Sequence, residues 1–211
     1  MNILVTADTH GSELGMTTVL GRVTSLAPDL LIIAGDITQF GQPQGYVKTL
    51  LSAIHTRALV VPGNCDPIGI IREIEQTGAT CLHNKKISLD GYTFVGYGGS
   101  PPTPFGTPFE IPEDEIANSL RALMEKGVIL VTHAPPKWYV DQTAHGLHAG
   151  SEAIAAIVED FQPRLVLCGH VHEARRYETD NGTTFVNPGP AAKGYAALVE
   201  LTNGIRVTML E

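Results

Sequence analysis

The chain has 211 residues, of which 43% are hydrophobic and 17% charged, and its net charge is −8 at pH 7. This composition suits one globular domain with a sizeable core, and the acidic balance argues against a protein that grips long nucleic acid by its phosphates. No apolar stretch approaches the length of a membrane span, and the first residues, MNILVTADTH, do not resemble a signal peptide. Cys65, Cys81 and Cys168 are too few for a disulfide framework. We therefore expect a cytoplasmic protein with free thiols, folded as a single domain over residues 1–211.

Apolar strand-like runs alternate along the chain with segments of helical periodicity. The strand-like runs cover residues 3–7, 30–34, 58–62, 128–132 and 164–168. Apolar residues at helical spacing follow the first three runs, and they are Leu14, Val19, Val23 and Leu26; Val47, Leu50, Leu51 and Ile54; and Ile70, Ile71 and Ile74. Nearly continuous Val, Ile and Leu runs are typical of strands buried on both faces. The alternation therefore predicts an α/β protein with a mainly parallel sheet.

Turn signals divide the remaining chain. Asp-Gly at 90–91 and Asn-Gly at 181–182 and 203–204 separate short β-like runs, and they predict hairpins beside the parallel strands. Residues 98–112, GGSPPTPFGTPFEIP, are rich in proline and glycine and predict a long surface loop that serves as a lid. Pro112 and the three acidic residues after it predict the start of a helix, because acidic side chains stabilise a helix N-terminus.

Polar side chains follow each of the five apolar runs, one to four residues past the predicted end of the strand. They are Asp8, His10, Asp36, Asn64, His133, His170 and His172. In an open α/β sheet, the carboxyl edge of the strands is where binding sites form. Each motif alone has an ordinary explanation, since Gly-Asp often caps a helix and a single histidine is usually structural. Their joint position predicts a metal site, whereas His55 and His83 lie outside the pattern and are expected to be structural or surface residues.

Aspartate, asparagine and histidine together suit divalent ions such as manganese, iron or zinc. Two ions need about seven or eight protein contacts, and Asp36, from the middle of the sheet, is the natural carboxylate to bridge them. Two ions roughly 3.5–4 Å apart hold a hydroxide for attack and bind both oxygens of an in-line phosphoryl displacement. The predicted site is therefore suited to the hydrolysis of a phosphate ester.

In order and spacing, the motifs Asp8-x-His10, Gly35-Asp36, Gly63-Asn64, His133 and Gly169-His170-x-His172 resemble the calcineurin-like metallophosphoesterase superfamily. The resemblance extends from residue 3 to about residue 190. It implies a four-layer α/β/β/α sandwich of mixed sheets with a dinuclear centre. It also implies that one metal is held by Asp8, His10, Asp36 and His172, and the other by Asp36, Asn64, His133 and His170.

Two positions depart from the usual pattern of that superfamily. Cys65 stands where a histidine that assists the leaving group usually follows Gly-Asn, and Gln39 stands where an acidic residue is frequent. A bacterial and archaeal branch of phosphodiesterases is similar in having Gly-Asn-Cys-Asp. Neither Cys65 nor Cys168 has an arginine at the spacing of cysteine-dependent phosphatases, so a nucleophilic thiol is not expected. Asp66 is expected to cap the next helix, with Pro67 at its first position.

The segment after His133 supplies other candidates for the site. His145 or His148 is expected to protonate the leaving group in place of the missing histidine, against the alternative of two exposed loop residues. The helix predicted to start at 150–151 offers its N-terminus to phosphate. Trp138, Tyr139 and Phe105 either stack on a nucleobase or pack as ordinary aromatic residues.

The sequence thus predicts a metal-dependent phosphoric ester hydrolase that acts most readily on a small phosphodiester. Its catalytic residues would be Asp36, Asn64 and His148 or His145, and its cofactors two divalent ions. Manganese is the expected metal, with iron, zinc, nickel or cobalt as alternatives. The competing functions are a catalytically weak scaffold of the same fold, a phosphomonoesterase and a nuclease. A membrane or extended nucleic acid is not expected as a partner, and a homo-oligomer remains open.

Overall fold

The fold is built from strands and helices that alternate through most of the chain. In chain order they are β1 (Asn2–Thr6), α1 (Glu13–Leu26), β2 (Leu30–Ala34), α2 (Tyr46–Ser52), β3 (Ala58–Val61), α3 (Ile70–Glu75), β4 (Thr80–Cys81), β5 (Lys85–Leu89), β6 (Tyr92–Tyr97), α4 (Glu113–Leu123), β7 (Ile129–Thr132), α5 (Glu152–Phe161), β8 (Leu165–Leu167), β9 (Arg176–Asp180), β10 (Thr183–Asn187), β11 (Ala196–Leu201) and β12 (Ile205–Leu210). Short 3₁₀ turns cover His172–Ala174 and Ala191–Lys193. This computed structural model describes residues 1–211.

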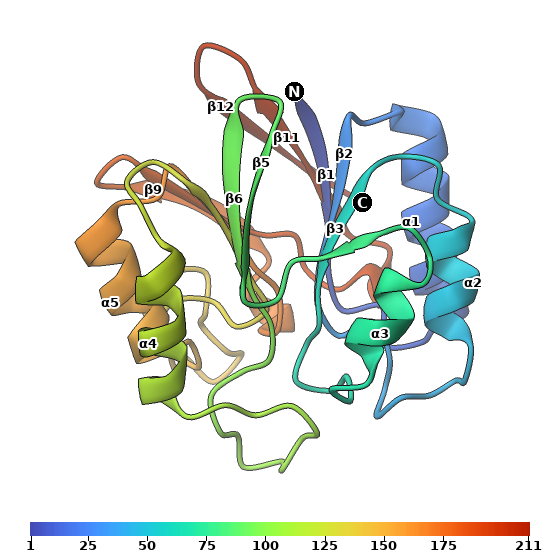
Figure 1. Ribbon diagram of the computed structural model, residues 1–211, viewed down its shortest axis with the longest axis horizontal. Helices are drawn as coiled ribbons and strands as arrows, with labels where there is room; N and C mark the ends of the chain where they lie inside the picture. The colour runs from blue at the N-terminus through green and yellow to red at the C-terminus, as the bar shows by residue number, and fades with distance from the viewer.

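The strands form two six-stranded sheets, and helices cover the outer face of each (Figure 1). One sheet has the order β12-β11-β1-β2-β3-β4, and the other has the order β5-β6-β7-β8-β10-β9. Helices α1, α2 and α3 lie outside the first sheet, and α4 and α5 lie outside the second (Figure 1). The predicted four-layer α/β/β/α sandwich is therefore confirmed.

Each sheet has a parallel centre with antiparallel edges. Strands β1 to β4 run parallel in the first sheet, while β11 and β12 pair antiparallel beside them. In the second sheet β6, β7, β8 and β10 run parallel, flanked by β5 and β9. The predicted hairpins at 90–91, 181–182 and 203–204 connect these edge strands. The expectation of one sheet was wrong, because the five apolar runs divide between two.

The core explains why the central strands are apolar throughout. Along β1, Ile3 and Val5 pack between the two sheets, whereas Leu4 packs under the helices of the first sheet. Strand β6 repeats the arrangement with Phe94 between the sheets and Val95 under α4 and α5. Alternate side chains therefore enter different layers, so both faces of a central strand must be apolar.

Most predicted helices begin where their sequence signals lie. Helix α4 begins at Glu113, and Ser151 caps α5 by accepting a hydrogen bond from the Ile154 amide. The predicted apolar face of the first helix was wrong at Leu14, whose side chain is 54% exposed. None of the helices has the length and apolar character needed to cross a membrane.

The loops that follow the parallel strands gather at one end of the sandwich, at the bottom of Figure 1. Backbone hydrogen bonds join neighbouring loops of the same sheet, as from Asp8 N–H to Gly35 O at 2.9 Å and from Gly169 N–H to His133 O at 2.9 Å. Between the sheets, His133 Nδ1 donates to Ala34 O at 2.8 Å. The predicted donors to a metal therefore leave strands of both sheets at the same end of the molecule.

We expect His83 to make the fold sensitive to acid. Its Nδ1 accepts a hydrogen bond from Gly98 N–H at 2.9 Å, and its ring packs on Tyr97 and Phe109. Burial, followed by the charge of Lys85, lowers the pKa of His83 to about 4. The folded state therefore favours the neutral ring, and the stability it confers is complete above the ordinary pKa of about 6.5 and is lost as the pH falls towards 4.

The measurement is urea denaturation of metal-free protein at pH 7 and pH 4.5, for the native chain and for His83→Gln. The variant should lose less stability between the two pH values than the native chain does. An equal loss in both proteins would show that His83 does not contribute to acid sensitivity.

Candidate metal centre

The loop after β1 and the loop after β2 hold the first predicted donors in an uncommon backbone conformation. Asp8, His10 and Asp36 have φ angles of 55°, 47° and 50°, and His170, after β8, has 69°. Residues other than glycine reach this left-handed region at a cost of about 1–3 kcal/mol each, and such strain collects at functional sites. The conformation is fixed by hydrogen bonds between the loops, including His10 N–H to Asp36 O at 2.9 Å.

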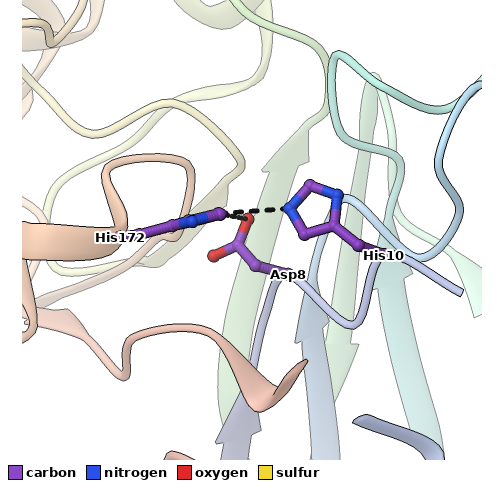
Figure 2. Close-up of side chains that lie close together, drawn as sticks. All are labelled: Asp8, His10 and His172. Carbon is purple, nitrogen blue, oxygen red and sulfur yellow. Dashed lines mark hydrogen bonds and ion pairs between the residues drawn. The ribbon is translucent and has the colours of Figure 1, made fainter. Parts of the chain in front are cut away.

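One group of donors forms around Asp8, which is fully buried. The Nε2 atoms of His10 and His172 lie 3.1 Å apart, and His172 Nε2 lies 3.7 Å from Asp8 Oδ1. Figure 2 shows the two imidazole rings pointing toward one another, with the Asp8 carboxylate beside them. Three side chains from two distant parts of the sequence therefore direct donor atoms at one point.

A second group forms around His133, which is also fully buried. Its Nε2 lies 2.8 Å from Asn64 Oδ1 and 3.4 Å from Asp36 Oδ1. The Asn64 amide is oriented by Thr107, whose Oγ1 accepts a hydrogen bond from Asn64 Nδ2 at 3.0 Å. The amide oxygen is consequently turned toward His133.

Asp36 lies between the two groups. Its Oδ2 is 3.7 Å from His10 Nε2 in the first group, and its Oδ1 is 3.4 Å from His133 Nε2 in the second. The Cys65 amide donates a hydrogen bond of 2.8 Å to Oδ1 and fixes the carboxylate. One carboxylate thus presents an oxygen to each histidine, as a ligand shared by two cations does.

His170 completes the set from the far side. Its ring centroid lies 5.0 Å from that of His133, and its backbone N–H donates to Asp8 Oδ1 at 3.3 Å. Burial, together with the charge of His133, lowers the pKa of His170 to about 4. Burial alone would raise the pKa of Asp8, but His172, His133 and His10 around it lower this pKa below its ordinary value. A neutral imidazole and an ionised carboxylate are the forms that bind a metal.

The hydrogen bonds of the imidazole rings show that cations fit this arrangement. His10 Nδ1 donates to Gln39 Oε1 at 2.8 Å, and His133 Nδ1 donates to Ala34 O at 2.8 Å. In a neutral ring, the Nε2 atom then keeps its lone pair. His10 Nε2 faces Asp36 Oδ2, His133 Nε2 faces Asn64 Oδ1 and Asp36 Oδ1, and buried Asp8 Oδ2 has no hydrogen-bond partner. Converging lone pairs repel one another unless a positive charge lies between them, so the donor set fits divalent cations.

Glycine is required where the strand ends approach one another. A Cβ atom at Gly63 would collide with the Asp36 carboxylate, and one at Gly35 would collide with His133 Nδ1. Gly35 also has a φ of +90°. These positions let two loops pass close enough for Asp36 to reach both groups of donors.

Comparison with known proteins agrees with this geometry. A family model described as calcineurin-like phosphoesterase matches residues 1–174. The chain belongs to the calcineurin-like phosphoesterase family. The resemblance drawn from the motifs is thereby confirmed, and membership makes the chain a metal-dependent phosphoric ester hydrolase.

Relatives of this phosphoesterase occur in archaea and bacteria. Protein MJ1162 of Methanocaldococcus jannaschii is 37% identical over 170 residues, which cover 77% of this chain and 78% of that protein. A 3',5'-cyclic-nucleotide phosphodiesterase of Nostoc is 25% identical over 172 residues, covering 77% of this chain and 64% of the relative. The crystal structure of TT1561 from Thermus thermophilus superposes with a TM-score of 0.77 at 18% identity, covering 98% and 97% of the two chains. That similarity shows the same fold.

Cys65 of this phosphoesterase is buried beside Asp36. Burial raises the pKa of the Cys65 thiol well above its ordinary value, and the charge of Asp36 raises it further. A thiol that keeps its proton is a poor nucleophile and a poor proton donor. The prediction that Cys65 is no nucleophile is consistent with this environment.

The prediction that Asp66 caps a helix was wrong. Helix α3 begins at Ile70, and Asp66 is instead fully buried. Its carboxylate accepts hydrogen bonds from the amides of Ile37 (3.0 Å), Thr38 (2.7 Å) and Gly63 (2.8 Å), and from the Thr38 hydroxyl at 2.7 Å. Burial and the charge of Asp36 raise the pKa of Asp66 to about 6. Asp66 therefore ties the loop after β2 to the loop after β3 behind the donors.

The two candidate proton donors have different surroundings. His145 is exposed, whereas Nδ1 of His148 lies 2.6 Å from Oδ1 of the fully buried Asp141. The His148 ring also packs on Trp138 at a centroid distance of 4.5 Å. Asn187 connects this segment to the metal-centre side, because its Nδ2 donates to Val140 O at 3.3 Å, Gly169 O at 3.3 Å and Val171 O at 2.9 Å.

The prediction that the N-terminus of α5 offers free donors to phosphate was wrong. Glu113 accepts hydrogen bonds from the amides of Glu152 and Ala153, both at 2.9 Å, and from the Ser151 hydroxyl at 2.6 Å. A carboxylate of the chain therefore already occupies the position that an anion would take.

Sequence reasoning missed three residues that hold the donors in place: Gln39, Thr107 and Asp141. Gln39 was noticed only as a departure from the family pattern, yet it sets the tautomer of His10. Thr107 lies in a Pro/Gly-rich loop with no periodicity, and its contact with Asn64 joins residues 43 positions apart. Asp141 carries no motif, and only its burial distinguishes it from other loop acids.

Replacement of Asp66 by alanine should destabilise the fold. The change leaves buried amides of two loops without an acceptor, so we expect the free energy of unfolding to fall by about 2–4 kcal/mol. Urea denaturation of metal-free protein measures the loss without a contribution from bound ions. Glu159→Ala, an exposed acid on α5, is the control and should change stability by less than about 0.5 kcal/mol. Equal stability of the two variants would contradict the tie between the loops.

Proposed function

We propose that this chain is a phosphodiesterase that hydrolyses a small phosphate ester at a centre of two divalent cations. The observation that carries the proposal is the position of Asp36, whose two oxygens face His10 and His133 at 3.7 and 3.4 Å. A carboxylate shared in this way suits two ions rather than one. The whole chain, residues 1–211, would act as the single domain that its length indicates.

The ligand sets follow from the two groups of side chains. Asp8, His10, Asp36 and His172 would hold one ion, and Asp36, Asn64, His133 and His170 the other. Two bound divalent cations would supply an activated water and neutralise the charge of the phosphate oxygens. The mixture of carboxylate, amide and imidazole ligands is compatible with manganese, our expected metal, and equally with iron, zinc, nickel or cobalt.

The protein side chains outside the ligand sets orient the reaction. Gln39 and the Ala34 carbonyl fix the tautomers of His10 and His133, so that Nε2 of each ring faces the centre. Asn64, held by Thr107, presents its amide oxygen to the same place. These contacts reduce the reorganisation needed when substrate and ions bind.

We assign proton donation to the leaving group to His148, with Asp141 as its positioning residue. The contact of 2.6 Å between His148 Nδ1 and Asp141 Oδ1 puts the proton of that bond on Nδ1 and leaves Nε2 facing outward. The buried carboxylate also fixes the orientation of the ring, which a group that transfers a proton to the leaving group requires. His145 has no such partner, and Cys65 holds its proton too tightly to replace it.

A phosphodiester is favoured over a monoester by the relatives. The Nostoc relative is described as a 3',5'-cyclic-nucleotide phosphodiesterase. A cavity of about 680 Å³ lies beside α5, and its lining includes Glu152, Glu159 and Asp180 against a single lysine, Lys137. None of the predicted metal ligands lines this cavity, so we do not assign the phosphate to it. A non-catalytic scaffold is the main alternative, and every ligand position of the family being filled weighs against it.

The metal centre is tested by replacing Asp36, the ligand that both ions would share, or His170, which would bind one ion. Asp36→Asn and His170→Ala should each lose bound metal and reduce the hydrolysis of bis(p-nitrophenyl) phosphate by about a hundredfold or more. Elemental analysis of the purified proteins reports the number and identity of the ions. His55→Ala, at an exposed position, should match the native chain in both measurements. Full turnover in protein stripped of metal would reject the mechanism.

The choice of proton donor is tested by varying the leaving group. His148→Ala should reduce kcat by about 10²–10⁴-fold for an alkyl phosphodiester, whose leaving group needs a proton, and far less for a p-nitrophenyl ester. Metal content should stay unchanged. His145→Ala should have little effect on either substrate, and the reverse order of the two variants would transfer the role to His145.

A further inference from the structure

Several large apolar side chains are exposed near the donor groups. The exposed large apolar residues of the chain are Leu14, Phe40, Ile68, Phe105, Trp138, Leu147 and Tyr177. Phe40, Ile68 and Phe105 lie in the loops that follow the parallel strands β2, β3 and β6, at the end that carries the donor groups. Exposed apolar residues scattered singly need no explanation, but their concentration around a site indicates a binding function.

Three of these residues lie on loops that converge at Asn64 and Cys65. Phe40 N–H donates to Cys65 O at 2.9 Å, and the next residue, Gly41, lies against Pro67, which precedes Ile68. Phe105 lies on the loop after β6, and two contacts tie this loop to Asn64: Thr107 Oγ1 with the side chain at 3.0 Å and Phe109 N–H with the backbone carbonyl at 3.0 Å. We name Phe40, Ile68 and Phe105 the apolar rim.

The apolar rim is held in place by the chain itself. Phe40 has a φ of 54°, a conformation that is costly for an aromatic residue and that keeps its side chain 51% exposed. Phe105, 80% exposed, lies at the apex of a turn clamped by Glu110. One Glu110 oxygen accepts hydrogen bonds from the Thr103 hydroxyl (2.5 Å), the Thr107 hydroxyl (2.7 Å) and the Thr107 amide (2.9 Å). These contacts, with that of Thr107 to Asn64, hold residues 98–112 beside the donor groups.

The loops of the apolar rim offer no positive charge. Residues 35–45, 62–69 and 98–112 contain no lysine and no arginine. Their aspartates are accounted for, since Asp36 belongs to the donor groups and Asp66 is buried among amides. A substrate with further phosphate groups would therefore find no counter-charge on these loops, whereas an uncharged apolar group would lose contact with water.

We infer that the substrate is a phosphodiester with an apolar, uncharged organic group that lies on the apolar rim. The inference rests on the proposed function, because the metal centre holds the phosphate while the rim receives the rest of the molecule. The loops of the rim are hydrogen-bonded to Asn64 and Cys65, which places the rim beside the donor groups that would hold the phosphate. Substrates with a single phosphate and a long apolar chain are thus selected over polyanionic ones.

The test is a series of p-nitrophenyl alkyl phosphates with methyl, butyl and octyl chains, each below its micellar concentration. The native protein with its metals should show kcat/KM rising at least tenfold from the methyl to the octyl ester, because a fully buried methylene gives about fourfold. The double variant Phe105→Ser, Phe40→Asn should reduce the ratio of octyl-ester to methyl-ester kcat/KM at least fivefold. Asparagine is chosen at position 40 because it tolerates the left-handed backbone. Tyr177→Ser, the control on β9, should hydrolyse both the methyl and the octyl ester within about twofold of the native rates.

The possible failures are distinguishable. Equal kcat/KM for methyl and octyl esters in the native protein would overturn the inference and leave the proposed function intact, as would equal losses on both esters in the double variant. No hydrolysis of the methyl ester by the native, metal-loaded protein would reject the proposed function itself. Sedimentation of the native and double-variant proteins tests whether a second copy of the chain binds the apolar rim instead. A dimer that only the double variant dissociates would assign the rim to a second copy and overturn the inference.

Discussion

The structure depends on one arrangement: a buried carboxylate, Asp36, held by the Cys65 amide between two imidazole nitrogens that already carry lone pairs. Gln39 and the Ala34 carbonyl accept hydrogen bonds from the other nitrogen of each ring, so Nε2 of both rings faces the Asp36 carboxylate. In a region of low dielectric such a cluster is unfavourable unless a positive charge enters it. The folded protein therefore favours bound cations at this site. Several of the donors also keep left-handed backbone conformations that are costly for residues other than glycine.

The two-sheet architecture makes this arrangement possible. Asp8, Asp36 and Asn64 leave strands of one sheet, whereas His133, His170 and His172 follow strands of the other. The sandwich brings the ends of both parallel centres together, and glycines at 35 and 63 let the loops approach without collision. Asp66 fastens two of these loops from behind with hydrogen bonds that cross between strands. The same contacts therefore stabilise the loops and fix the geometry of the centre.

The surroundings of the centre differ from those expected of an enzyme that binds polyanions. The loops at Asn64 carry no lysine or arginine and expose apolar side chains, and the acids near them are buried or engaged in hydrogen bonds. Burial and the charge of Asp36 raise the pKa of the Cys65 thiol, at the position that often carries a histidine in this family. A histidine held by a buried aspartate lies on a different loop. The donor groups of the family thus lie beside loops that expose apolar side chains and carry no lysine or arginine.

The sequence by itself determined the fold class, the family and the identity of the residues that converge, because these depend on strand patterns and on polar residues at strand ends. Asp8, His10, Asp36, Asn64, His133, His170 and His172 could all be read from that pattern. The tertiary structure alone decided which sheet each strand joins, since periodicity reports burial and not the neighbouring strand. It also decided that Asp66 ties two loops rather than capping a helix, that Glu113 fills the N-terminus of α5, and that Gln39, Thr107 and Asp141 hold other side chains in place. Each of these contacts joins residues whose proximity is set by the packing of loops, and no local propensity encodes it.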